Sequence, residues 1–267
     1  MIETIRNAWK IPELRKKILF TIFALLIFRL GSVVPVPFIN SDLLGTTLNN
    51  MGGIFSLLGT MNGTAFSMAA VFALGVQPYI NSSIIIQLLT VAIPALERLQ
   101  RDGGEEGRKK IAAITRYVTV AIAILQGLGY YTLIANTGNG NLIDAAGLPG
   151  WWVAIVIILC FTAGSAFVMW LGEQITEFGI GNGISIILFA GILSRVPGMV
   201  ETIYTGIRNN LNGVTDQFSL PWWGAILIVI GMLAIIVLIV FIQNSERRIP
   251  VQYAKRVVGR KMYGGQS

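Results

Sequence analysis

The sequence predicts an all-α, polytopic membrane protein with six transmembrane helices and a short re-entrant helix between the first two. The prediction rests on composition and on the spacing of charges. Hydrophobic residues make up 54% of the 267 residues and charged residues 12%, whereas charged residues are roughly 25% of a soluble domain. Between Asp42 and Glu97, 54 consecutive residues carry no charged side chain. Long, apolar, charge-free intervals are typical of helices that cross a bilayer.

A spanning helix needs roughly 20 apolar residues at a rise of about 1.5 Å per residue. The chain has six intervals that approach or exceed this length. We expect the first helix over 18–34, with Arg29 near its far end. The other five helices are expected over 68–92, 111–135, 151–172, 183–203 and 222–242.

The apolar segment 54–67, just before the second expected helix, is too short to cross a bilayer, and Gly59 and Gly63 interrupt it. An apolar segment of this length must lie within protein or re-enter a cavity from one side. A broken helix next to a spanning helix with polar residues is typical of a pore or a transport site. The sequence therefore favours a conducting membrane protein over a simple anchor.

Lysine and arginine are distributed unevenly between the two sides of the membrane. The arm 1–17, the connection between the second and third helices with its edges, and the segment after the sixth helix all fall on one side. They hold 17 of the 20 basic residues, and the opposite loops hold one, Arg208. The positive-inside rule therefore places both termini in the cytoplasm. No small-residue cleavage site follows the first apolar run, so we expect the arm to be retained.

The second expected helix has polar side chains at membrane depth. Such groups must meet other helices or water, because an unpaired polar group in hydrocarbon is costly. They either form hydrogen bonds between helices or face a wet interior, and their density beside a broken helix favours the wet interior. Ile80 and Ile84, one turn apart, are either ordinary core or lipid-facing residues or part of an apolar constriction. The polar residues are Gln77, Asn81, Ser82, Ser83 and Gln87.

The residue types present argue against several classes of function. The chain has no histidine and a single cysteine, Cys160, which removes imidazole bases, the commonest metal ligand and disulfide frameworks. The GIGNG turn at 179–183 is followed by no lysine and preceded by no strand, so a nucleotide site is not expected. The better interpretation is a tight turn with Asn182 near the start of the next helix. We therefore expect no enzyme, no metal and no cofactor.

Two basic segments fall on the predicted cytoplasmic side, ERLQRDGGEEGRKK and QNSERRIPVQYAKRVVGRKMYGGQS. They are either solvated loops or surfaces that bind anionic lipid, RNA or an acidic protein face. After Arg248, the alternating pattern IPVQYAKRVVGRKMY favours an extended, strand-like protrusion over a helix.

Three runs of the sequence resemble the SecY family of bacterial protein-conducting channel subunits: GVQPYINSSIIIQLLTVAIPALERLQRDGGEEGRKKI, EQITEFGIGNGISIILFAGI and NSERRIPVQYAKR. The resemblance extends along the whole chain but covers only the N-terminal part of the family, helices 1 to 6 of 10. It implies part of a pseudo-symmetric ten-helix channel. The implied divisions are a cytoplasmic arm at 1–17, a first five-helix half at 18–203 with a plug at 53–67, a sixth helix at 222–242, and a truncated cytoplasmic loop at 243–267.

The resemblance also implies roles for individual residues. An aliphatic pore ring would include residues of the second and fifth helices, namely Ile80, Ile84, Leu188 and Ile192. A plug that closes the external funnel would include Ile54, Phe55, Leu57, Leu58 and Thr60. Asn81 and Gln87 would border a lateral gate. A basic surface for docking a motor or a ribosome would include Arg247, Arg248, Lys255 and Arg256.

The implied function is conduction of unfolded secretory polypeptides across the bacterial plasma membrane and lateral release of membrane segments into it. The implied partners are SecE and SecG, the SecA motor ATPase, the ribosome, the nascent or preprotein polypeptide, the lipid bilayer, and helices 7 to 10 on this or another chain. The residues alone leave an alternative, half of a secondary transporter with a broken-helix substrate site. A transporter would more often need a carboxylate inside the membrane, whereas Glu173 and Glu177 fall on the cytoplasmic side.

Overall fold

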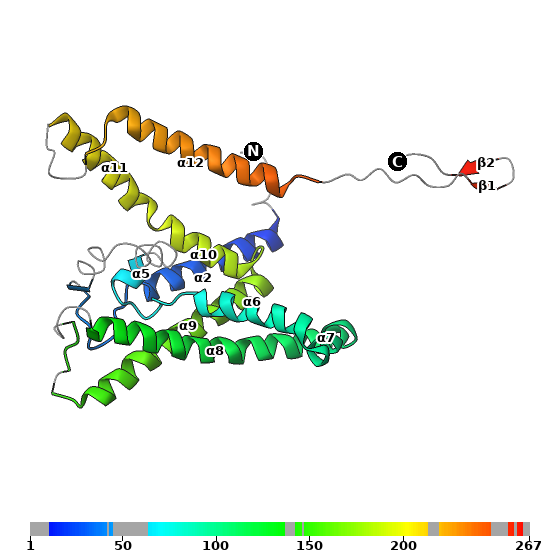
Figure 1. Cartoon of the computed structure of the whole chain (residues 1–267), viewed down its shortest axis with the longest axis horizontal. Coiled ribbons are helices and arrows are strands. Elements are labelled where there is room, and N and C mark those ends of the chain that lie inside the picture. The colour runs from blue at the N-terminus through cyan, green and yellow to red at the C-terminus, as the bar shows by residue number, and fades with distance from the viewer. Residues whose placement is uncertain are drawn as a thin grey trace. The chain divides into compact units, whose positions relative to one another are not determined.

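The structure, a computed structural model, describes residues 11–41, 43–44, 64–136, 142–145, 147–212, 219–246, 256–258 and 261–263. These residues are almost entirely helical (Figure 1). By contacts between backbones the chain divides into two compact units, Met1–Pro197 and Gly198–Ser267. The helices are α2 (Pro12–Gly31), α5 (Thr64–Ser67), α6 (Gln77–Ala92), α7 (Pro94–Arg101), α8 (Gly104–Asn136), α9 (Gly150–Phe178), α10 (Gly183–Leu193), α11 (Val196–Leu211) and α12 (Trp222–Gln243).

The all-α, multi-span prediction is confirmed in its main features. Four segments in the described parts of the chain are long and apolar enough to cross a membrane. They are Gly104–Asn136, Gly150–Phe178, Gly183–Leu211 and Trp222–Gln243. A fifth is obtained when α6 and α7, which meet at an angle of 101°, are counted as one broken span.

Helix α2, the first helix that the sequence predicts, is not among these segments. It begins earlier than expected, because Pro12 provides a favourable first helical position, and it ends at Gly31. Basic residues at both ends leave only 18–28 free of charge within the helix. The flexible stems of lysine and arginine allow such ends to reach the membrane surface. The helix itself is thus present, while its apolar part is shorter than that of the other spans.

The second helix was predicted over 68–92 as one element, and this prediction is wrong for its first third. Residues 68–76 form turns, and the helix begins at Gln77. Ala69 has φ +46° and Gly75 has φ +53°, values that a right-handed helix does not contain. At the other end, Ile93 is extended before Pro94, as the residue before a proline prefers, and the chain turns there into α7.

Most residues of the irregular segment 68–76 are buried within the first unit, apart from the exposed Met68 and the half-buried Val71, so the backbone groups of the segment need partners inside the protein. The amide of Val71 donates to the carbonyl oxygen of Val34 at 2.9 Å, and the hydroxyl of Ser165 donates to that of Gly75 at 3.3 Å. Gly164 of α9 makes the close approach possible, because a Cβ there would lie 2.0 Å from the carbonyl oxygen of Val71. The close approach of α9 therefore accommodates the irregular segment before α6, which has Pro78 in its first turn.

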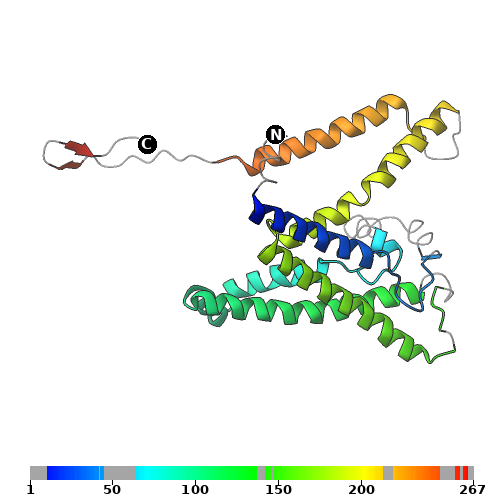
Figure 2. The ribbon, with the colours of Figure 1, turned by 180° about the vertical axis from the view of Figure 1, so that it is seen from behind.

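Around this segment, α6 and α8 run side by side, and α9 packs against α8, α2 and α10 (Figures 1 and 2). One apolar cluster joins α2, α9 and α10 through buried residues such as Phe28, Val168, Ile175 and Ile187. A second cluster, which includes Phe66 and residues of α8 and α9, surrounds the turns at the other end of these helices. The first unit is thus a packed bundle with its own core.

The second unit contains α11 from Gly198 onward, α12 and a hairpin. Of the 22 residues of α12, all of which the structure describes, only Ala225 is buried. Strands β1 (Arg256–Val258) and β2 (Lys261–Tyr263) pair in antiparallel register, with Arg256 opposite Tyr263. The prediction of an extended, strand-like backbone after Arg248 is therefore confirmed for these six residues, while the protrusion stays a prediction.

Candidate functional site

A cavity of about 470 Å³ lies in the first unit, between α6, α8, α9 and the start of α10. One side of it is aliphatic and the rest is polar or charged. Helix α6 contributes Tyr79, Ile80, Ser83 and Ile84. The other helices and the turn before α10 contribute Arg116, Glu173, Thr176, Glu177, Asn182, Ile184 and Ser185.

The rotation of α6 about its axis explains which of its residues reach the cavity. Its buried residues recur every four positions: Pro78, Ser82, Ile86 and Thr90. Successive residues of a helix are turned by about 100°, so Ile80 and Ile84 lie roughly 200° from Ser82, on the opposite side. Ile84 is accordingly 50% exposed. Burial of one stripe of α6 directs the aliphatic pair into the cavity.

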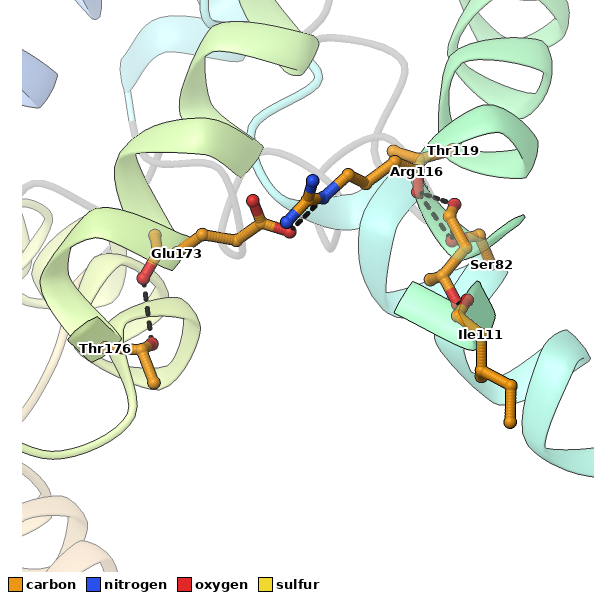
Figure 3. Close-up of polar contacts among 8 residues, drawn as sticks. Ser82, Ile111, Arg116, Thr119, Glu173 and Thr176 are labelled. Atoms are coloured by element: carbon orange, nitrogen blue, oxygen red, sulfur yellow. Dashed lines mark hydrogen bonds and ion pairs between the residues drawn. The ribbon is translucent and has the colours of Figure 1, made fainter. Parts of the chain in front are cut away.

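The hydroxyl groups of Ser82 and Thr119 join α6 to α8 behind the cavity. The Oγ of Ser82 lies 2.6 Å from Oγ1 of Thr119 and 3.2 Å from the carbonyl oxygen of Thr115. Thr119 also donates to the Thr115 carbonyl at 2.7 Å, and Thr115 donates to that of Ile111 at 2.9 Å. Figure 3 shows this chain of contacts on the side of α8 that faces α6.

An ion pair crosses from α8 to α9 at the wall of the cavity. The Nε of Arg116 donates to Oε1 of Glu173 at 2.8 Å (Figure 3). Glu177, one turn further along α9, is exposed in the same cavity. Two carboxylates and one guanidinium therefore face the space beside the aliphatic pair.

The turn before α10 is fixed by hydrogen bonds, as the sequence predicted for Asn182. The Oδ1 of Asn182 accepts from the amides of Ile184 at 3.1 Å and Ser185 at 3.3 Å, so Asn182 is the N-cap of α10. The amide of Gly183 donates to Oγ1 of Thr176 at 2.9 Å. Gly181 has φ +66°, a conformation that glycine adopts without strain. These contacts hold the start of α10 against the end of α9.

The residues predicted as a pore ring are brought together only in part. Ile80 and Ile84 line the cavity. Ile80 and Leu188 both pack against the apolar cluster of α2, α9 and α10. Ile192 is exposed on α10 and is not among the described residues that line the cavity. Ile80 thus shares the cavity with Ile84 and the apolar cluster with Leu188, and the ring itself remains a prediction.

Asn81 and Gln87, predicted to border a lateral gate, lie about 60° to either side of Ile84 around the axis of α6. Asn81 is half-buried, and Gln87 is exposed, with its Nε2 donating to Oγ of Ser83 at 3.3 Å. The predicted plug residues Ile54, Phe55, Leu57, Leu58 and Thr60 lie outside the described residues. Of the predicted docking residues, Arg247, Arg248 and Lys255 also lie outside, and only the backbone of Arg256, in β1, is described.

The sequence analysis missed the ion pair and the hydroxyl contact. Arg116 falls inside the third helix expected from the sequence, over 111–135, and lies 12 residues after Gly104 within α8. An ionisable residue inside a spanning helix is itself an indication of function. Within the described ranges, no group of three or more acidic, cysteine or histidine side chains could hold a metal ion.

Comparison with known proteins gives consistent matches. A model of the SecY family matches residues 70–267. Protein translocase subunit SecY of Bacillus subtilis (strain 168) is 41% identical over 268 residues, covering 100% of this chain and 60% of that protein. The subunit of the same name from Streptomyces coelicolor is 39% identical over 277 residues, with the same two coverages. The chain therefore spans about 60% of the length of these curated relatives.

Solved structures show a related fold. The structure of a protein conducting channel matches with a TM-score of 0.56 and 18% identity, covering 94% of this chain and 52% of that chain. Sec61 in the canine ribosome-channel complex from the endoplasmic reticulum matches with the same score and identity, covering 89% and 49%. Together with the apolar helices, these matches identify a multi-pass membrane protein.

Proposed function

This chain belongs to the SecY family, and from that premise we propose that it forms the N-terminal part of a channel that conducts unfolded polypeptides. Its relatives are named protein translocase subunits. The first six helices of the channel would come from this chain, and helices 7 to 10 would complete it. Hydrophobic segments would leave sideways, between α6 with Asn81 and Gln87 on one side and helix 7 on the other.

The observation that carries the proposal is the two-sided cavity beside α6. Ile80 and Ile84 present branched aliphatic side chains, while Arg116, Glu173 and Glu177 keep the adjoining space wet. Aliphatic side chains contact a passing chain of any sequence, because dispersion and hydrophobic contacts are non-directional. When no chain is present, an apolar constriction blocks ions by dewetting. These are the properties that a polypeptide channel requires.

We further propose that Leu188 and Ile192 complete the aliphatic ring together with residues of the later helices. Residues 53–67, with Ile54, Phe55, Leu57, Leu58 and Thr60, would act as the plug on the outer side. Such a plug would reduce ion leak through a ring that seals imperfectly alone.

The proposed location is the bacterial plasma membrane, with both ends of the chain in the cytoplasm. The basic loop with Arg247, Arg248, Lys255 and Arg256 would dock the SecA motor or the ribosome, and SecE and SecG would pack around the helices. Support for partners of this kind comes from the related Sec61 structure, which was solved in a ribosome-channel complex. Energy would come from the motor or from chain elongation, and no catalytic step is assigned to this chain.

Reconstitution tests the proposal. The chain, with the helices that complete the channel in its relatives, is placed in proteoliposomes with the motor and an unfolded preprotein. We expect the preprotein to become protected from external protease, and protection to require a signal sequence. A vesicle that passes a small solute but no preprotein would instead support the transporter alternative, which none of the matches reported above favours.

A further inference from the structure

Ser82 and Thr119 form a buried hydroxyl contact between α6 and α8. Both residues are 0% exposed. The Ser82 hydroxyl also lies 3.2 Å from the carbonyl oxygens of Tyr79 and Thr115. Thr119 has its own acceptor, the Thr115 carbonyl. Whichever hydroxyl donates in the 2.6 Å contact, one hydrogen bond crosses between the helices.

This contact has a directional effect that the apolar packing of α6 does not have. The exposed residues of α6 include Ile84, Ile85, Leu88, Leu89 and Val91. In a membrane, one apolar face of a helix is nearly as well accommodated by lipid as another, so apolar packing alone weakly specifies the rotation of the helix. When Ser82 turns toward hydrocarbon, by contrast, its hydroxyl loses the Thr119 and Thr115 partners on α8 and keeps only the Tyr79 carbonyl of its own helix. Ser82 therefore favours one rotation of α6.

We propose that the Ser82–Thr119 contact sets the rotation of α6 and thereby holds Ile80 and Ile84 toward the cavity. Ser82 and Thr119 are positioning residues, because they act on the proposed seal through the two isoleucines. Ser82 lies on the opposite side of α6 from these isoleucines and contacts Thr119 of α8. The functional consequence rests on the proposed function, whereas the rotation itself can be measured without any transport.

The test of rotation uses cysteine accessibility in membranes that contain the assembled channel. Cys160, the one cysteine, is replaced by serine, and single cysteines are placed at position 84 or at position 85. Residue 84 lines the cavity, while Ile85 is exposed and is not among the cavity-lining residues described. With the contact intact, we expect a charged, water-soluble maleimide to label position 84 and to spare position 85.

Removal of the contact should reduce the ratio of the two labelling rates. For Ser82→Ala and for Thr119→Val, which keeps the side-chain volume, we expect a fall of about three- to tenfold, the range that one interhelical hydroxyl bond in a membrane protein supports. Thr119→Ser keeps the hydroxyl and should keep the ratio. Thr162→Val is the matched control, because the Thr162 hydroxyl donates only within α9, to the Ile158 carbonyl at 2.8 Å.

Two results would overturn the inference. One is an unchanged ratio in both Ser82→Ala and Thr119→Val. The other is an equal fall in Thr119→Ser and Thr119→Val, which would assign the effect to packing instead of the hydroxyl. In a parallel assay, ion leak is expected to rise in the two hydroxyl-deficient variants. Polypeptide transport by the parent protein separates the rotation from the proposed function. A changed labelling ratio with no polypeptide transport even in the parent protein supports the rotation and rejects the proposed function.

Discussion

Arg116 and Glu173 join two helices across 57 positions of the sequence, with 2.8 Å between the Nε of Arg116 and Oε1 of Glu173. The contact lies at the wall of the cavity, and its side chains are 53% and 25% exposed. Water therefore reaches the pair, which limits its contribution to stability. The pair nevertheless bridges α8 and α9 beside the aliphatic pair of α6.

The first prediction concerns this ion pair. Glu173→Gln should lower the free energy of unfolding by about 0.5–1 kcal/mol, the range for a partly exposed pair. A double-mutant cycle with Arg116→Gln, followed by thermal unfolding in detergent, should give a coupling energy of similar size. The control is Glu97→Gln, which breaks a more exposed pair with Arg101 within one helix and should cost less than about 0.5 kcal/mol. Additive effects of the two substitutions would show that the pair contributes nothing.

Sequence reasoning alone could not have found this pair. The order of charges along the chain shows that Arg116 and Glu173 each border a long charge-free interval, but it contains no information on which helices become neighbours. The spans around α8, α9 and α12 were predictable because long charge-free intervals can only be accommodated in lipid or in a core. The N-cap role of Asn182 was also predictable, because the geometry of a helix start depends on the residues next to it.

The irregular segment 68–76 shows the opposite case. Its residues are as apolar as those of a spanning helix, so the composition predicted a helix there. The left-handed conformation of Ala69 cannot be predicted from its residue type. Pro78 and Pro94 did contain a usable signal, since proline favours a first turn and disfavours helix in the residue before it. The packing of Gly164 against Val71, which holds the segment, is a tertiary contact and depends on the whole bundle.

The second prediction tests that packing. Gly164→Ala places a Cβ only 2.0 Å from the carbonyl oxygen of Val71. The buried backbone must therefore shift. We expect the free energy of unfolding to fall by about 1–3 kcal/mol, as for an overpacked core. Gly129→Ala in α8 is the control, because no atom lies within 4 Å of a Cβ there; it should be neutral or stabilise by up to about 1 kcal/mol. Equal stability of the two variants would contradict the close approach.

The third prediction concerns the aliphatic side of the cavity. Ile84→Asn should raise the ion conductance of the closed channel, because an amide holds water in a constriction that is otherwise dewetted. Clients with weak signal sequences should also be accepted more readily. Single-channel recording in planar bilayers measures the first effect, and preprotein protection in proteoliposomes measures the second. Ile84→Leu, which keeps volume and apolarity, should behave like the parent protein. Wild-type conductance in the asparagine variant would remove Ile84 from the proposed ring. Leu188→Asn would then show whether α10 contributes to the ring without Ile84.

The fourth prediction concerns the basic loop that contains the hairpin of β1 and β2. Reversal of Arg247, Arg248, Lys255 and Arg256 to glutamate should leave membrane insertion unchanged and alter stability by no more than about 0.5 kcal/mol, as is usual for surface substitutions. Binding of the motor or ribosome should nevertheless be lost, because complementary charge becomes repulsion.

Binding to vesicles that contain the channel, followed by co-sedimentation, measures this loss directly. The matched control replaces the three arginines with lysine and keeps Lys255, so that the charge is retained. Binding by the parent protein should weaken as salt is raised, since exposed charges are screened beyond about 8 Å at physiological ionic strength. Full docking of the glutamate variant at low salt would mean that the loop is only a solvated surface. The partner would then reach the channel through the other basic segment predicted on the cytoplasmic side, around α7 and the start of α8.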